Sequence, residues 1–121
     1  MTRQYVEPIT EAALIKAREE IHAWPEPGWS EFVSSARAIE KLESLGIRTL
    51  CGREVINTEF RAGAVESQVA AALADAKKKG VSEAILARLD GVTGVVGILE
   101  TGRPGPVIGI RAELDCVCVT E

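Results

Sequence analysis

The sequence has little of what would assign it to several large classes of protein. No apolar run is long enough to cross a bilayer, and the first residues lack the apolar centre of a secretory signal. The basic residues form no tract apart from 77–79, which argues against nucleic-acid binding. The odd count of three cysteines argues against a disulfide framework. We therefore expect a cytoplasmic protein with neither a membrane nor a nucleic acid as its partner.

The motifs of nucleotide-binding and nucleophilic enzymes are missing as well. The glycines form neither a G-x-G-x-x-G turn nor a G-x-x-x-x-G-K-[ST] loop. The only histidine, His22, has no serine or cysteine nearby at a spacing typical of a catalytic triad, although pairing in space stays open. The sequence therefore contains no nucleotide-binding motif, and a structural role is the favoured interpretation of His22, because a lone histidine is more often structural than catalytic.

What the chain does contain is typical of one globular domain. Its 121 residues are 46% apolar and 26% charged, with a formal net charge of −4. These values are ordinary for a folded domain with a buried core, so disorder is not expected.

Helical periodicity dominates the first half of the chain. Thr10 is expected to cap a first helix that Pro25 ends, and Ser30 to cap a second helix that ends at Gly46. Apolar residues at three- and four-residue spacing predict an apolar stripe on the first helix and a buried face on the second. The stripe is formed by Leu14, Ala17, Ile21 and Trp24, and the buried face by Phe32, Ala36, Ile39 and Leu42. Ile47 is expected to fold back onto the last turn of the second helix.

Two further helices are predicted after a less regular stretch. Residues 48–64 indicate a short strand followed by an irregular loop. An alanine-rich helix follows at about 65–79 and ends at Gly80. Ser82 is expected to cap a shorter fourth helix that ends at Gly91.

Two stretches rich in valine and isoleucine, 93–100 and 106–114, have apolar residues on both faces. This pattern is typical of strands buried on both sides, and a loop rich in glycine and proline separates them. We therefore predict a β-hairpin that follows the N-terminal helices in an α/β layer architecture. Such strands need neighbouring strands and covering helices that the chain does not go on to supply. We expect the chain to be an incomplete piece from the N-terminal side of a longer protein.

Four residues at the end of the second stretch are candidates for chemistry. Glu113 and Asp115 share a face if the strand continues, at a position where open α/β sheets bind ligands. The alternative is that the strand simply emerges into solvent there. Cys116 and Cys118 also share a face, but a structural zinc needs four ligands, and the remaining cysteine and histidine stand at no recognised spacing. The favoured interpretation of these cysteines is that of small buried apolar side chains.

Two segments resemble the signatures of one enzyme family. "IHAWPEPGWSE" resembles the H-x-x-P-E-x-G-(aromatic)-x-E motif of metal-dependent amidohydrolases of the aminoacylase/carboxypeptidase superfamily, matching at His22, Pro25, Glu26, Gly28 and Glu31. "TGRPGPVIGIRAELDCVCVTE" resembles the G-P-(apolar run)-R-A-D-M-D-A-L-P-x-x-E stretch of the same family. "CGREVINTEFRAG", followed by the alanine-rich helix, is similar to one branch, which contains the A subunits of p-aminobenzoyl-glutamate hydrolases.

The resemblance implies a fold and a reaction. Residues 1–121 would be the N-terminal segment of a three-layer, mixed-sheet metallopeptidase catalytic domain, without the rest of that domain and without the inserted dimerisation domain. The full-length protein would use a divalent metal, zinc or manganese, whose ligands lie mostly beyond this chain. It would act on a small N-acyl amino acid, and it would form a homodimer or pair with a related second subunit.

The resemblance also assigns roles to single residues. Asp115 matches the family's second aspartate, which lies beside the metal centre and helps to orient it. Glu113 matches the first aspartate but is one methylene longer, and Cys116 and Cys118 stand where alanine and proline are common. The motif that includes Glu26 has a mainly structural role.

The sequence therefore predicts part of a metal-dependent hydrolase that cleaves the amide bond of p-aminobenzoyl-glutamate or related N-acyl amino acids. The isolated 121-residue chain is expected to be inactive, because it supplies too few ligands. The alternative is a freestanding α/β binding module, or an inactive paralogue, that does no chemistry. A coding sequence that continues with Gly-Cys-Gly-His-Asp and later histidines would favour the enzyme.

Overall fold

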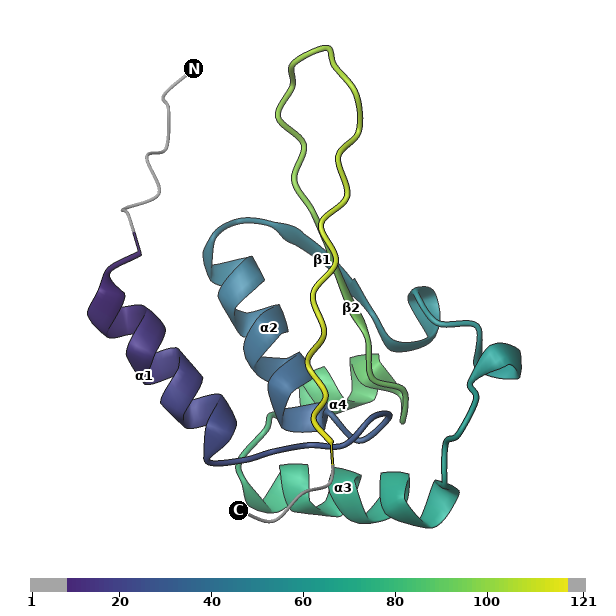
Figure 1. Ribbon diagram of the computed structural model, residues 1–121. Helices are drawn as coiled ribbons and strands as arrows, with labels where there is room; N and C mark the ends of the chain where they lie inside the picture. The colour runs from purple at the N-terminus through teal and green to yellow at the C-terminus, as the bar shows by residue number, and fades with distance from the viewer. Residues whose placement is uncertain (1–8, 118–121) are drawn as a thin grey trace.

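The computed structural model describes residues 9–117, which form an α/β arrangement of four α-helices and a two-stranded antiparallel sheet (Figure 1). In chain order the elements are α1 (Glu11–His22), α2 (Phe32–Ser44), β1 (Arg48–Cys51), two 3₁₀ turns (Gly52–Glu54 and Thr58–Phe60), α3 (Glu66–Lys78), α4 (Glu83–Leu89) and β2 (Val95–Ile98). The predicted helices and the short strand between them are confirmed. Within this range no helix is long and apolar enough to span a membrane.

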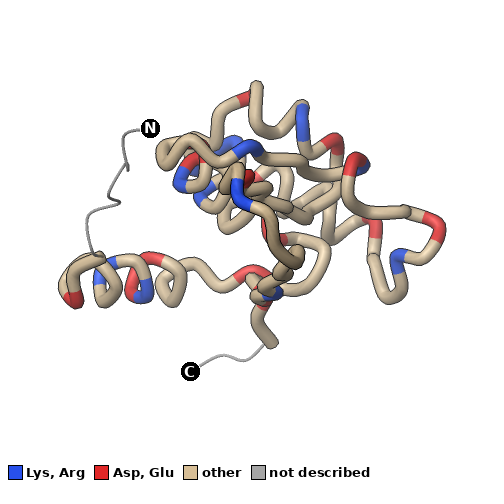
Figure 2. The backbone as a smooth tube through the Cα atoms, turned by 90° about the horizontal axis from the view of Figure 1, so that it is seen from above, with Lys and Arg blue, Asp and Glu red and all other residues tan. Residues whose placement is uncertain are grey.

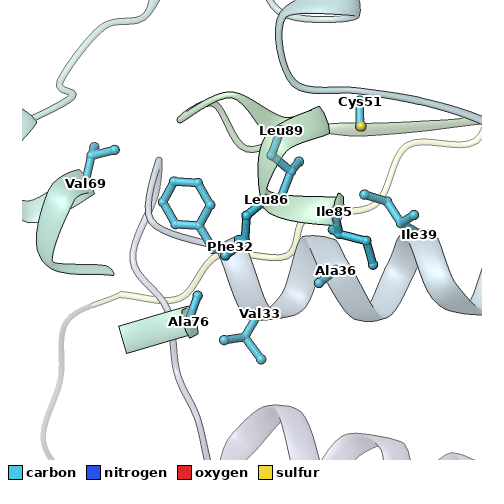
Figure 3. Packing of buried hydrophobic residues seen from close by; sticks show 10 residues of the cluster. All are labelled: Phe32, Val33, Ala36, Ile39, Cys51, Val69, Ala76, Ile85, Leu86 and Leu89. Atoms are coloured by element: carbon cyan, nitrogen blue, oxygen red, sulfur yellow. The ribbon is translucent and has the colours of Figure 1, made fainter. Parts of the chain in front are cut away.

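Helix α2 forms one wall of the hydrophobic core. Phe32, Ala36 and Ile39 are buried on the face that the sequence predicts, while Leu42 is only half-buried. The facing side chains come from α3, α4 and β1 (Figure 3), and they are Val69, Ala76, Ile85, Leu86, Leu89 and Cys51. The core therefore lies between α2 and the elements that follow it in the chain.

The C-terminus of α2 directs the chain into the sheet. Gly46 adopts a φ of 72°, and its N–H donates to the carbonyl of Glu43 at 2.9 Å. The N–H of Ile47 donates to the carbonyl of Leu42 at 3.0 Å. These two bonds satisfy carbonyls that the helix leaves unpaired, as the sequence predicts. Strand β1 begins at the next residue.

Strand β2 pairs with β1 and not with residues 106–114. The register places Arg48 opposite Ile98 and Cys51 opposite Val95. The predicted hairpin is therefore wrong, and 106–114 contains no strand. An apolar pattern indicates that a segment can form a strand, but it does not indicate which strand pairs with it. Here the turn after α2 brings β1 alongside β2.

The stretch that follows β2 leaves the sheet. Residues 99–110 form an extended loop that projects beyond it (Figure 1), and Ile108 and Ile110 are 81% and 95% exposed. The expectation that this stretch is buried on both faces is wrong within residues 9–117, because no described element covers it.

Helix α1 lies to one side of the other helices (Figure 1) and contributes no buried residue. Its start is as predicted, since Thr10 Oγ1 accepts a hydrogen bond from the N–H of Ala13. The predicted apolar stripe is largely exposed among the described residues, since Leu14 and Ile21 are 56% and 46% exposed. Periodicity gives the direction of an apolar face but not what covers it. Acidic and basic residues are interspersed along α1 (Figure 2), as expected for a solvated helix.

Trp24, just after α1, is the point at which this part of the chain meets the core. It is partly buried against the core cluster, and Lys79 Nζ lies 3.7 Å from the centroid of its ring. This cation–π contact joins the turn after α1 to the end of α3.

The ends of α4 follow the sequence closely. Ser82 Oγ accepts a hydrogen bond from the N–H of Ile85 at 3.2 Å, which is the predicted cap. The helix ends in two residues of positive φ, Asp90 at 48° and Gly91 at 71°. This tight turn starts the path of the chain toward β2.

Candidate functional site

The turn between α1 and α2 is built around a buried carboxylate. Glu26 is only 6% exposed, and it accepts hydrogen bonds from the N–H groups of Val33 at 2.9 Å and Ser34 at 2.8 Å. Glu31, at the N-cap position, makes no side-chain cap bond, and the predicted cap by Ser30 is wrong. A carboxylate satisfies these N–H groups more strongly than a hydroxyl does, because the helix N-terminus carries partial positive charge.

Trp29 ties the same turn to the loop before α3. Its φ of 68° is rare for a residue with a side chain. Its indole Nε1–H donates to the carbonyl of Ala62 at 2.7 Å, and the guanidinium carbon of Arg61 lies 5.7 Å from its ring centroid. Arg61 also donates to Glu66 Oε1 at 2.7 Å. These contacts hold the turn in a strained conformation.

Glu31 ties the turn to the start of β2. The hydroxyl of Thr93, a buried residue, donates to Glu31 Oε2 at 2.5 Å. Glu31 and Thr93 are 62 residues apart in sequence. Their hydrogen bond therefore joins the turn before α2 to the residues just before β2.

The C-terminal segment lies against the same turn. The N–H of Cys116 donates to the carbonyl of Glu26 at 2.9 Å, and Pro27 and Cys116 form an isolated parallel bridge. A Cβ placed on Gly28 would lie 3.7 Å from Asp115 Oδ2. The two segments that carry the family resemblance are therefore in contact.

Two hollows flank the C-terminal segment. The larger has a volume of about 640 Å³, and its lining includes Gly28, Glu31, Ser35, Gly94, Glu113 and Asp115. The smaller, of about 470 Å³, lies against the end of α1, and its lining includes His22, Glu26, Ser34, Asp115 and Cys116. Asp115 lines both hollows. The hydroxyl of Ser35 is buried in the wall of the larger one without a hydrogen-bond partner among the described residues.

The structure places the two predicted site residues close together but in different settings. Glu113 accepts a hydrogen bond from Arg111 at 2.6 Å, and its side chain is 66% exposed. Asp115 is exposed too, but it lies beside Gly28 of the turn. Both face the larger hollow. Asp115 is the nearer of the two to a backbone anchor, because the N–H of the next residue, Cys116, bonds to Glu26.

The structure describes two of the three cysteines, Cys51 and Cys116, and they lie in different settings. Cys51 is buried in the core, and burial raises the pKa of its thiol, as expected for a small apolar packing residue. Cys116 is half-buried, and Cys118 lies outside the described residues. Within residues 9–117, no group of three or more histidine, cysteine, aspartate or glutamate side chains is placed to hold a metal ion. These residues by themselves do not fit a metal centre.

A polar cluster formed by Glu43, Thr49 and Arg88 was not predicted. Arg88 donates to Glu43 Oε1 and to Thr49 Oγ1, at 2.9 Å each, and the Thr49 hydroxyl donates to Glu43. The hydrogen bond from Thr49, followed by that from Arg88, lowers the pKa of Glu43. The cluster joins α2, β1 and α4, so its geometry indicates a structural role. Because Arg88 is 45 residues from Glu43 and 39 from Thr49 in sequence, no local pattern could have revealed its part in the cluster.

Curated relatives match most of this chain. It is 39% identical over 109 residues to a Haemophilus influenzae homolog of the p-aminobenzoyl-glutamate hydrolase A subunit, and the match covers 89% of this chain and 26% of the relative. It is 36% identical over 106 residues to the A subunit of p-aminobenzoyl-glutamate hydrolase from Escherichia coli, covering 86% of this chain and 24% of the relative. It is 34% identical, with the same coverage, to indole-3-acetyl-aspartic acid hydrolase of Enterobacter agglomerans. The chain spans about a quarter of the length of these relatives.

A solved structure agrees with these matches. An aminobenzoyl-glutamate utilization protein from Klebsiella pneumoniae superposes with a TM-score of 0.72 at 35% identity, over 78% of this chain and 24% of that one. No family model matches the chain.

The fold and these relatives together define the class. The chain is homologous to a segment of hydrolases whose names specify conjugates of glutamate or aspartate. More particularly, it is homologous to part of the A subunit of p-aminobenzoyl-glutamate hydrolase. The resemblance to the A subunits of p-aminobenzoyl-glutamate hydrolases, predicted from residues 51–63 and the helix that follows them, is confirmed.

Proposed function

We propose that residues 1–121 are the N-terminal segment of the catalytic domain of a hydrolase that cleaves the amide bond of p-aminobenzoyl-glutamate or a related N-acyl amino acid. The observation that carries the proposal is the identity of 36–39% to hydrolase A subunits over 86–89% of this chain. The contact between the "PEPGW" turn and the Asp115 segment supports it, because both segments bear the family motifs.

The exposed apolar loop also supports the proposal. Val107, Ile108 and Ile110 are almost fully exposed, although their pattern is that of a buried strand. The relatives are about four times as long as this chain, since it covers 24–26% of each. The remainder of a full-length hydrolase would supply the neighbouring strands of a three-layer, mixed-sheet domain.

We further propose that the full-length hydrolase uses zinc or manganese, with most ligands beyond this 121-residue chain. A bound divalent metal would make water nucleophilic at neutral pH and polarise the scissile carbonyl. Asp115 is proposed to help orient that centre, with Glu113 in a secondary role. Because the described residues hold no ligand cluster, we expect the isolated 121-residue chain to be inactive.

The assembly and location belong to the same proposal. The relatives are named as A subunits, which supports pairing with a related second subunit or a homodimer. The substrate is a small soluble conjugate, and we propose a cytoplasmic enzyme that binds neither membrane nor nucleic acid.

The test is an assay of the full-length protein with p-aminobenzoyl-glutamate, indole-3-acetyl-aspartate and N-acetyl amino acids as substrates. Hydrolysis is measured as the release of the free amino acid. We expect turnover of at least one aryl conjugate. Asp115→Asn should lower kcat by about 10²-fold or more, as expected when a polar group that orients an active site is lost. Glu100→Gln, in the exposed loop before this segment, is the matched control and should keep wild-type activity.

Two outcomes would contradict the proposal. A folded full-length protein without amidase activity toward any of these conjugates would favour the non-catalytic module or the inactive paralogue. Full activity in Asp115→Asn would remove this residue from the site while leaving the hydrolase assignment in place.

A further inference from the structure

Glu26 makes hydrogen bonds in two directions at once. Its carboxylate accepts from the first turn of α2, through the N–H groups of Val33 and Ser34. Its backbone carbonyl accepts the N–H of Cys116, the residue directly after Asp115. One residue therefore joins a helix of the core to the segment that bears the candidate site residue.

From this geometry we propose that Glu26 is the positioning residue for Asp115. The carboxylate fixes the Glu26 backbone to the N-terminus of α2, which is anchored in turn by the buried Phe32. The fixed carbonyl then sets the register of Cys116 against Pro27. That register brings Asp115 beside Gly28, on the wall of both hollows.

The need for such an anchor follows from the rest of the segment. Residues 99–115 are all exposed, and Glu113 bonds only to its own neighbour Arg111 among the hydrogen bonds found in the described chain. The bond from Cys116 to Glu26 is the first backbone contact of this segment with the domain after β2. Loss of the anchor would leave Asp115 without a fixed distance to α2.

A second glutamate of the same turn offers a matched control. Glu31 bonds to Thr93 and so holds β2, not the Asp115 segment. Both Glu26→Gln and Glu31→Gln keep the shape of the side chain and remove its charge. The proposal requires that the two variants differ in their effect on the exchange rate of the Cys116 amide.

Amide hydrogen exchange on the 121-residue chain is the direct test. In Glu26→Gln, the Val33 and Ser34 amides should exchange at least about tenfold faster than in the wild type, because their hydrogen bonds to a charged carboxylate are lost. The Cys116 amide should speed up by a similar factor, because on this proposal the Glu26 carbonyl that accepts it is no longer held in place. In Glu31→Gln, the Cys116 amide should keep its wild-type rate. The Ile47 amide, at the other end of α2, is the reference for a loss of global stability, and the Val33, Ser34 and Cys116 amides should speed up more than it does in Glu26→Gln.

The proposal is overturned if the Val33 and Ser34 amides speed up while Cys116 does not, or if Glu31→Gln affects Cys116 equally. If Glu26→Gln unfolds the chain, Glu26→Asp is used in its place, because it retains the charge on a shorter side chain. The same comparison of the three amides then decides the question.

The catalytic consequence rests on the proposed function and is measured separately in the full-length hydrolase. Glu26→Gln should lower kcat with little change in KM, and it should cause no further loss when added to Asp115→Asn. A multiplied loss in the double variant would mean that Glu26 acts independently of Asp115, which overturns the positioning role. If the full-length protein has no amidase activity, the proposed function fails, and the exchange experiment still decides whether Glu26 positions the segment.

Discussion

Gly52 is the residue whose replacement has the most sharply defined structural cost. It follows β1 with a φ of 59°, and its N–H donates to the carbonyl of Gly94 at 3.0 Å. A Cβ at this position would lie 2.3 Å from the carbonyl oxygen of Leu89 and 2.8 Å from the carbonyl carbon. These are backbone atoms of a fully buried residue. The same oxygen accepts the N–H of Val92, so it cannot move without loss of that turn.

The expected loss of stability for Gly52→Ala has two parts. A residue with a Cβ in left-handed conformation costs about 1–2 kcal/mol. Overpacking against fixed atoms adds about 1–3 kcal/mol. Gly46→Ala isolates the first part, because Gly46 has a φ of 72° and no atom within 4 Å of the added Cβ. The two variants should therefore differ by about 1–3 kcal/mol, with Gly52→Ala the less stable.

Urea unfolding followed by tryptophan fluorescence measures this difference, provided that the dependence on urea concentration is the same for both variants. The reasoning is refuted if both free energies of unfolding agree within about 0.5 kcal/mol. That result would show that the chain between α4 and β2 yields to the methyl group, and that the close approach to Leu89 is not a constraint.

Two further predictions concern charge and exposed apolar surface. Because the folded pKa of Glu43 is lowered from its ordinary value of 4.5, its contribution to stability is present above that value and is lost as pH falls through the folded pKa. Urea midpoints between pH 3 and pH 7 should show this loss in the wild type and not in Glu43→Gln, whereas an identical pH dependence would contradict it. The exposed Ile108 and Ile110 should make the 121-residue chain self-associate. Light scattering should show a mass that rises with concentration, and less so in Ile108→Lys; a wild type that stays monomeric at every concentration would argue against this surface.

The local features of the fold could be predicted from sequence because their causes are local. Thr10 and Ser82 cap helices through backbone groups three residues away, and Gly46 ends α2 through its own φ. Glu26 shows where this reasoning stops. It lies outside α2, seven and eight residues before the N–H groups it accepts from, so a search for a cap at the helix boundary selects Ser30 instead.

The candidate site was predicted only as far as the family motifs extend. These motifs single out Glu113 and Asp115 and the turn around Gly28, but not the contact between them. The contact depends on the bond from Cys116 to Glu26, 90 residues apart in the chain (116 minus 26). Pairing of this kind is set by the assembled core and has no signal in a single sequence.

The wrong prediction of a hairpin and the exposed apolar stripe on α1 have one physical explanation. In both cases the apolar pattern is real, with Val107, Ile108 and Ile110 in one segment and Leu14 and Ile21 in the other, yet these side chains are exposed. An apolar pattern of this kind is expected where the side chains are buried in the complete protein. Residues 9–117 contain no element that covers either face. Since the relatives are about four times longer than this chain, the proposed remainder of the hydrolase accounts for both faces at once. Burial of Ile108 and Leu14 in the full-length protein, measured as protection from solvent relative to the 121-residue chain, is the consequence that this explanation requires.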